Sequence, residues 1–222
     1  MMNRAGLAAL VVGAGLAGAA AYWFFGLRAT TPAVPAAPAA AASPDQPARR
    51  LADTVPAFQL LDREGQLRSL QDWQGKSLVV NFWATWCAPC RREIPLLQQI
   101  ARERADDGVE VVGIAVDFRD KVLAYADEMQ IGYPLLIGEQ DALDAAAAFG
   151  VDAIGFPFTI FTDNRGRVVF AQIGELHRAE AELILDEVAA VNAGEQSPAE
   201  AREMIENGLP ALQHKSAGKS AG

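Results

Sequence analysis

Short apolar runs and amphipathic stretches alternate through the middle of the chain. Ser77–Trp83 and Val109–Val116 are almost wholly apolar, which indicates strands buried on both faces of a parallel sheet. Between them, the stretch from Cys87 to about Arg104 carries apolar residues at helical spacing, and Gly108 suits the end of that helix. Pro95 lies inside this helix, where we expect a kink.

The same alternation continues toward the C-terminus. Helical patterns at 121–130 and 142–149 surround a short strand at 134–137. Strands at 158–162 and 167–173 form an expected hairpin, and a helix at 180–192 closes the body. A second hairpin is expected near the N-terminal side, with strands at 56–61 and 66–70. Strands alternating with helices predict an α/β sheet with crossover helices.

The first 28 residues have the pattern of a membrane anchor. Ala5–Leu27 holds no charged residue and ends in the aromatic run at 22–25, so it is long enough to span a bilayer. A cleaved signal peptide is the alternative, but its apolar core is shorter, and cleavage after Ala21 would expose those aromatics. No cysteine precedes Cys87, which excludes a lipoprotein.

Two further segments differ in composition from the body, which is expected over residues 51–193. Residues 29–50 are rich in alanine and interrupted by proline, which predicts a semi-extended tether. Residues 194–222 form a tail, in which Ser197–Glu200 reads as a capping box that starts a short helix. We expect this helix to stop before Gly208 and the end of the tail to be disordered.

Charge and cysteine content exclude several classes of protein. The chain of 222 residues has a net charge of −9, and residues 1–50 carry four arginines against one aspartate, so the body is acidic. An acidic body without a basic stripe argues against nucleic-acid binding. Only two cysteines are present, and the histidines are His177 and His214, so a zinc site would lack its remaining ligands. We therefore expect no metal and no external cofactor.

The two cysteines stand where a strand passes into a helix. A helix N-terminus favours a thiolate at Cys87, and Cys90, one turn on, can close a disulfide with it. The pair is therefore interpreted as a two-electron thiol–disulfide switch. Two buried structural cysteines are the alternative, but such cysteines lack this strand-to-helix setting.

The segment Phe82–Cys90, followed by Glu93 and Pro95, resembles the TlpA/ResA/CcmG group of thioredoxin-like proteins. The resemblance covers roughly residues 51–192. It implies a thioredoxin-like α/β fold, with a central mixed sheet flanked by helices, an N-terminal β-hairpin and an inserted αβ element. It also implies a bacterial protein held in the inner membrane by one transmembrane helix, with its catalytic domain in the periplasm.

The resemblance extends to individual site residues. Cys87 is expected to be the nucleophile and Cys90 the resolving thiol, with Pro89 between them and Trp86 flanking an exposed redox site. Glu93 matches the acid of the group and is a candidate for tuning the thiol pKa values. The alternative is that Glu93 only complements the helix dipole.

A second site element is expected at 155–159. Phe156 and Pro157 match a family motif whose proline follows a cis peptide bond, faces the disulfide and helps to bind substrate. The alternative is a trans proline that opens a strand. Residues 152–154 make the preceding loop longer than in the family, and Phe156 and Phe158 are expected to make its rim apolar.

Three further residues are interpreted from the sequence. Asn81 occupies the position of a buried aspartate in thioredoxin that helps to deprotonate the resolving thiol, a proton that an amide cannot accept. Arg91 and Arg92 are expected to be solvated.

By resemblance, the predicted function is an extracytoplasmic thiol–disulfide oxidoreductase that works mainly as a reductase. Its expected clients are protein thiols or disulfides in cytochrome c or oxidase copper-site assembly, with electrons from a membrane donor of the DsbD/CcdA kind. A peroxiredoxin-like peroxidase is one alternative, but it needs threonine at the position of Ala84. A non-enzymatic Cu(I) carrier is the other, since thiolates suit Cu(I).

Overall fold

The computed structural model describes residues 50–151 and 155–219, with side chains up to Leu212. The expected anchor, the expected tether and the loop residues 152–154 lie outside the described residues. Within the described part of the chain, no helix combines the length and the apolar character that crossing a membrane requires.

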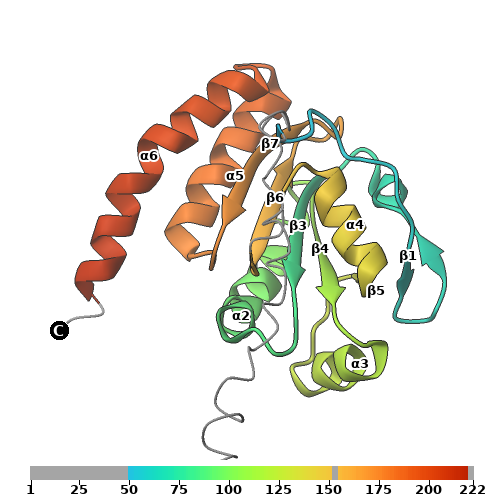
Figure 1. Cartoon of the computed structure of the whole chain (residues 1–222). Coiled ribbons are helices and arrows are strands. Elements are labelled where there is room, and N and C mark those ends of the chain that lie inside the picture. Colours follow the sequence, from blue (N-terminus) through green and yellow to red (C-terminus); the bar gives the residue numbers. More distant parts are fainter. Residues whose placement is uncertain (1–49, 152–154, 220–222) are drawn as a thin grey trace, which may run out of the picture. The chain divides into compact units, whose positions relative to one another are not determined.

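Strands and helices alternate as the sequence pattern predicts (Figure 1). The strands are β1 (Leu60–Asp62), β2 (Leu67–Arg68), β3 (Ser77–Trp83), β4 (Val109–Val116), β5 (Leu135–Gly138), β6 (Phe158–Thr162) and β7 (Val168–Ile173). The helices are η1 (Leu70–Trp73), a 3-10 helix, followed by α2 (Ala88–Glu103), α3 (Arg119–Glu128), α4 (Gln140–Ala148), α5 (Arg178–Ala193) and α6 (Pro198–Lys219).

All the strands belong to one seven-stranded mixed sheet in the order β2-β1-β5-β4-β3-β6-β7. Strand β3 lies inside it, parallel to β4 and antiparallel to β6. Strands β4 and β5 are parallel, whereas β1 pairs antiparallel with both β5 and β2. The chain thus has the expected thioredoxin-like α/β fold, with the N-terminal hairpin added beside β5.

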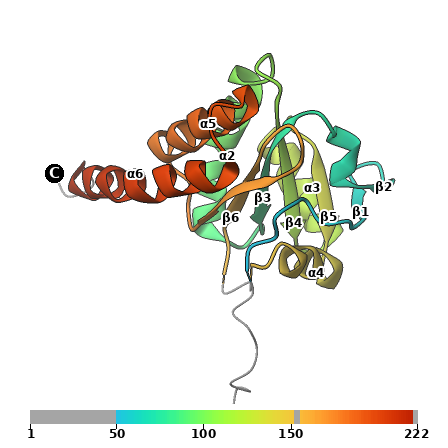
Figure 2. The ribbon, with the colours of Figure 1, turned by 90° about the horizontal axis from the view of Figure 1, so that it is seen from above.

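Alternation along β3 separates two cores, because successive strand residues point to opposite faces of a sheet. Val79 and Trp83 pack in the core that receives α2, α3, α5 and α6. Val80 and Phe82 pack in the core on the other face, with α4, η1 and the hairpin. Figure 2 shows α2 and α5 on one side of the sheet and α4 on the other. Asn81 therefore points toward the face that α2 covers.

The N-terminal hairpin differs in detail from the sequence prediction. Its strands are shorter than expected, and the chain leaves β2 at Ser69 instead of continuing as a strand to Leu70. The side chain of Ser69 accepts a hydrogen bond from the amide of Gln71, and Asp72 accepts one from the amide of Ser69. These capping contacts favour the turn of 3-10 helix at η1 over a longer strand.

The tail also differs from the prediction. Helix α6 starts at the expected capping box but runs to Lys219, well past Gly208 and Pro210, where a short helix was expected to stop. Ala201, Ile205 and Leu209 lie one turn apart and are buried in the core with α5. A Cβ on Gly208 would lie 2.8 Å from a methyl carbon of Leu183, so this glycine lets α6 approach α5 closely.

Candidate functional site

The two cysteines form a disulfide at the start of α2, with an S–S distance of 1.99 Å. Cys87 is the N-cap residue of the helix, and its Sγ accepts a hydrogen bond from the amide of Cys90 at 3.2 Å. Pro89 occupies the first turn, where a missing N–H group costs no helical hydrogen bond. The helix start therefore presents both an N–H donor and its dipole to Cys87, as the sequence predicts.

The two sulfur-bearing residues differ in access. Cys87 is 5% exposed and Cys90 is fully buried at 0%. Trp86, which precedes Cys87 in the chain, is 68% exposed, whereas Trp83 is a core residue at 0%. Of the two cysteines, only Cys87 has any surface exposed in this structure.

The loop before β6 forms the second side of the site. The Phe156–Pro157 peptide bond is cis, as expected, and the carbonyl oxygen of Phe156 lies 3.5 Å from Sγ of Cys87. The ring of Phe156 meets the ring of Trp86 edge-on at 6.1 Å between centroids. Phe158 was expected at this rim, but it is fully buried and stacks on Phe82 in the core, because it is the first residue of β6.

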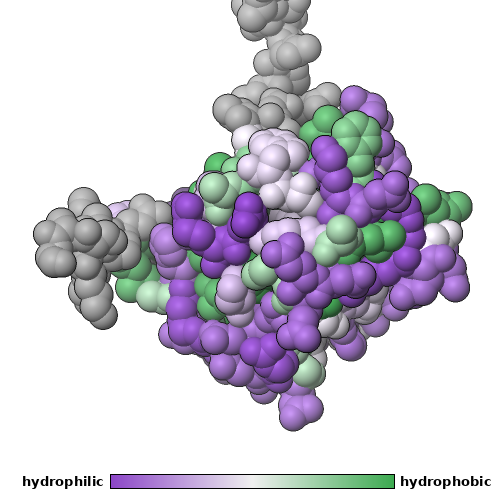
Figure 3. Space-filling view, turned by 90° about the horizontal axis from the view of Figure 1, so that it is seen from below, coloured by the Kyte–Doolittle hydropathy of each residue, from purple (hydrophilic) through white to green (hydrophobic). Residues whose placement is uncertain are grey.

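This site lies on the side of the molecule where the parallel strands β3 and β4 end. Figure 3 views the molecule from that side and shows hydrophobic residues in small patches between hydrophilic ones. Trp86, which precedes Cys87 in the chain, and Phe118, which follows β4, are exposed apolar side chains. With Leu143 and Asp117 they line a hollow in the surface.

Glu93 is buried beneath the disulfide, at 1% exposure, on the face of α2 that carries Cys90 one turn earlier. Its Oε1 accepts a hydrogen bond from Nδ2 of Asn81 at 2.7 Å, and its Oε2 accepts one from the amide of Leu176 at 2.7 Å. Burial raises the pKa of Glu93 to about 7, although both hydrogen bonds lower it. A buried carboxyl group with this pKa can exchange a proton near neutral pH.

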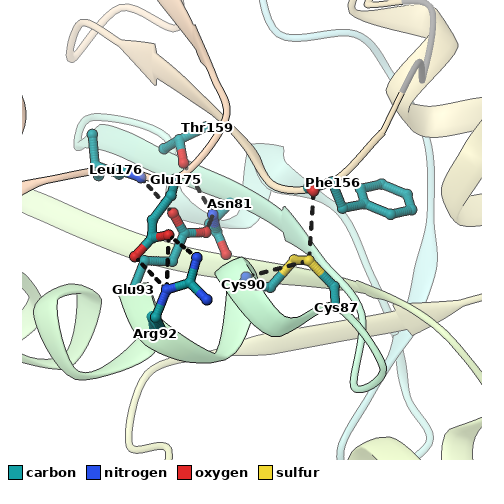
Figure 4. Close-up of a disulfide and its surroundings, with 9 residues drawn as sticks. All are labelled: Asn81, Cys87, Cys90, Arg92, Glu93, Phe156, Thr159, Glu175 and Leu176. Atoms are coloured by element: carbon teal, nitrogen blue, oxygen red, sulfur yellow. Dashed lines mark hydrogen bonds and ion pairs between the residues drawn. A yellow bond between two sulfur atoms is a disulfide. The ribbon is translucent and has the colours of Figure 1, made fainter. Parts of the chain in front are cut away.

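Asn81 links Glu93 to strand β6 (Figure 4). Its Nδ2 also donates to Oγ1 of Thr159 at 3.0 Å, and the two residues are direct partners across β3 and β6. Its Oδ1 is buried and has no hydrogen-bond partner among the described residues. The amide of Asn81 on β3 thus lies beside the buried carboxyl group of Glu93 on α2.

The side chain of Arg92 is 60% exposed, as expected from the sequence, but its guanidinium group also has a partner on another element. Its guanidinium group forms a forked ion pair with Glu175, in which Nε lies 3.0 Å from both carboxylate oxygens. Glu175 immediately precedes Leu176, whose amide contacts Glu93. This pairing could not be predicted from the sequence, because the two residues are 83 positions apart.

The sequence is similar to a known protein family and to named bacterial proteins. The AhpC/TSA family model matches residues 51–171, which is more than half of the chain. The chain belongs to the AhpC/TSA family. The thioredoxin-like protein YneN of Bacillus subtilis is 34% identical over 138 residues, covering 60% of this chain and 76% of the relative. The thiol–disulfide oxidoreductase ResA of Geobacillus thermodenitrificans is 30% identical over 145 residues, covering 65% of this chain and 81% of the relative.

A solved structure is similar to this AhpC/TSA-family protein. The thioredoxin-family thiol:disulfide interchange protein of Chlorobium tepidum TLS superposes with a TM-score of 0.56 at 30% identity, covering 63% of this chain and 97% of that one. With a cysteine pair closed as a disulfide and relatives of this kind, the protein is a thiol–disulfide oxidoreductase of the ResA type.

Two other features of this oxidoreductase concern the alternatives. Ala84, where a peroxiredoxin-like site needs threonine, is fully buried at the end of β3. In the part of the chain that the structure describes, no cluster of three or more His, Cys, Asp or Glu side chains could hold a metal ion.

Proposed function

We propose that this protein reduces disulfides in client proteins, with Cys87 as the nucleophile and Cys90 as the resolving thiol. The observation that carries the proposal is the difference in access: Cys87 is the partly exposed member of a disulfide at a helix start, and Cys90 is fully buried. The carbonyl of Phe156 lies 3.5 Å from Sγ of Cys87, so we propose that an extended client segment pairs with the backbone of this loop.

The chemistry balances as a two-electron exchange. The Cys87 thiolate attacks one sulfur of the client disulfide, which forms a mixed disulfide and releases the other client sulfur as a thiolate. The Cys90 thiol then loses its proton and attacks Sγ of Cys87, which frees the second client thiol. The client is reduced by two electrons, and the protein is left with the Cys87–Cys90 disulfide.

Glu93 is proposed as the acceptor of the Cys90 proton. Its carboxyl group lies on the same buried helix face as Cys90, one turn away, and its pKa of about 7 lies within reach of neutral pH. Asn81 orients it by donating to Oε1. A glutamate that only complements the helix dipole does not need to be buried. The burial of Glu93 therefore supports a role in proton transfer.

We also propose where and for whom the protein works. By its resemblance to the TlpA/ResA/CcmG group, residues 5–27 anchor it in the bacterial inner membrane, and the catalytic domain lies in the periplasm. Its clients are then cysteines of apocytochrome c or of oxidase copper-site proteins, and a membrane carrier of the DsbD/CcdA kind returns the electrons. The protein needs no cofactor beyond its own cysteine pair.

Trapping of mixed disulfides tests this proposal. Cys90→Ser removes the resolving thiol, so covalent client adducts should accumulate in cells and disappear on reduction. Cys87→Ser should accumulate none, because the remaining sulfur is buried. Identification of the trapped proteins by mass spectrometry names the clients. Adducts on Cys87→Ser but not on Cys90→Ser would show that the assignment of the two cysteines is wrong.

A further inference from the structure

The connection between β7 and α5, residues Gly174–Leu176, touches three separate parts of the site in three successive residues. The amide of Gly174 donates to the carbonyl of Pro157 at 2.9 Å. Glu175 pairs with Arg92 in the first turns of α2, and the amide of Leu176 donates to Oε2 of Glu93 at 2.7 Å. Figure 4 shows Arg92, Glu175, Leu176 and Glu93 grouped on one side of the disulfide.

These contacts are of two kinds. The two hydrogen bonds donated by backbone amides lie inside the molecule, since Pro157, Leu176 and Glu93 are all buried. The ion pair lies outside, because the Arg92 side chain is 60% exposed and that of Glu175 is 21% exposed. Gly174 has a φ of 92°, a conformation that favours glycine and turns the chain from β7 toward α2.

We propose that the β7–α5 connection, held to α2 by the Arg92–Glu175 ion pair, positions Glu93 for proton transfer and ties it to the loop at Pro157 that receives the client. The proposal rests on the proposed function, because it gives Arg92 and Glu175 the status of positioning residues for the same exchange. Neither residue touches the sulfur atoms in the described contacts.

The groups that face Glu93 come from several elements. Asn81 of β3 donates to it, and Thr159 of β6 shares that amide. Burial is the main cause of the raised pKa of Glu93, and the charge of Glu175 raises it further. Burial, and then the charge of Glu93, raise the pKa of Tyr133. The Leu176 amide favours the charged form, so loss of this hydrogen bond raises the pKa of Glu93.

Variants of the ion pair separate positioning from simple charge effects. Arg92→Lys keeps the charge but loses the planar fork, and Arg92→Gln loses both. Glu175→Gln has two opposite effects on the pKa of Glu93. Loss of the ion pair should raise this pKa, whereas loss of the negative charge of Glu175 should lower it. Arg178→Gln is the matched control, because Arg178 forms similar exposed ion pairs with Glu103 and Glu182 that do not reach Glu93.

The first measurement is amide hydrogen exchange, which needs no redox activity. If the ion pair holds the connection, Arg92→Lys and Arg92→Gln speed exchange at Leu176 and Gly174, and Arg178→Gln leaves both amides unchanged. Unchanged exchange in Arg92→Gln would overturn the proposal. An equal increase in Arg178→Gln would also overturn it, because the effect would then be a general loosening of the helices.

The second measurement is the titration of Glu93 by carbon NMR of its carboxyl group. Exposed ion pairs are weak, so Arg92→Gln should raise the midpoint by only ~0.2–0.7 pH units. Arg92→Lys should also raise the midpoint of Glu93, but by less than Arg92→Gln does. Glu175→Gln should likewise raise it by less than Arg92→Gln does. A midpoint that follows charge alone, unchanged in Arg92→Lys and lowered in Glu175→Gln, would contradict positioning.

The third measurement is the pH profile of client disulfide reduction, which should shift in Arg92→Gln with the Glu93 midpoint. A wild-type protein that reduces no disulfide would contradict the proposed function, while the exchange and NMR results would still decide the positioning of Glu93. The protein could also reduce disulfides while Arg92→Gln changes neither the pH profile nor the exchange rate of the Leu176 amide. That result would support the proposed function and refute this inference.

Discussion

A charged carboxylate is costly to bury without a countercharge. Glu93 is buried, and it has two neutral hydrogen-bond donors instead of a cation. The amides of Asn81 and Leu176 each satisfy one oxygen, but the side chain has no cation against it in the described contacts. The folded protein therefore favours the protonated form more than the unfolded chain does. Because the pKa lies at about 7, the charge of this residue changes within the physiological range.

This burial predicts a dependence of stability on pH. The folded pKa of Glu93 is raised from 4.5 to about 7, so the folded state binds the extra proton between those values. Its contribution to the free energy of unfolding is fully present below pH 4.5 and is lost as the pH rises to about 7, a loss of roughly 3 kcal/mol. Urea unfolding of the oxidised protein at several pH values measures this slope.

Glu93→Gln should remove that slope, because the amide has the same shape but does not titrate. The exposed Glu182→Gln is the control and should keep the slope of the parent protein. Parallel pH profiles for the parent protein and Glu93→Gln would show that Glu93 titrates as it does in the unfolded chain.

For individual residues, the sequence predicted those features that depend on residues close by in the chain. The spacing of Cys87 and Cys90 at a strand-to-helix junction was sufficient to predict the disulfide. The sequence left two readings open for Glu93, because its contacts come from β3 and from the β7–α5 connection, far away in the chain. Arg92 is exposed as expected, but its ion pair with Glu175 could not be predicted for the same reason, since Glu175 follows a different strand.

Among the α-helices, α6 is the one that departs most from its predicted extent. Glycine and proline usually end a helix, and both occur within α6. Tertiary packing decides the outcome here, since Gly208 faces Leu183 and the buried stripe of Ala201, Ile205 and Leu209 rests on the body. The strands were predicted more closely, because their apolar runs are short and bounded by turn residues.

The packing of α6 predicts unequal effects of two neighbouring substitutions. Ile205 is fully buried, whereas Met204 is 55% exposed. Ile205→Ala should lower the free energy of unfolding by about 2–4 kcal/mol, as removal of a buried side chain does. Met204→Ala should change it by no more than about 0.5 kcal/mol. Equal losses in urea denaturation would show that α6 does not dock through its buried stripe.

For the molecule as a whole, the reduction potential follows from what surrounds the cysteine pair. Ala88 and Pro89 between the cysteines offer no charge and no side-chain donor, so the thiolate lacks the strong extra stabilisation that an oxidising protein needs. We expect a potential nearer to that of thioredoxin, about −270 mV, than to that of DsbA, about −120 mV. A glutathione titration that gave a value above roughly −150 mV would contradict this expectation.

The membrane anchor is a separate prediction for the whole chain. Residues 5–27 should stay attached, so the protein should sediment with the membrane fraction and keep its original N-terminal sequence. Membrane fractionation followed by N-terminal sequencing measures both. A soluble species that begins at Tyr22, or within residues 29–50, would instead indicate a cleaved signal peptide.

The order of the strands has one more consequence, for the behaviour of the protein at high concentration. A sheet that ends in a long open strand offers backbone groups to a second sheet, and such edges promote aggregation. Here one outermost strand, β2, is only two residues long. At the other outermost strand, β7, the guanidinium group of Arg202 donates to the carbonyls of Val168 and Val169, beside the irregularity in its pairing with β6. Helix α6 thus covers an edge that would otherwise be open to another chain.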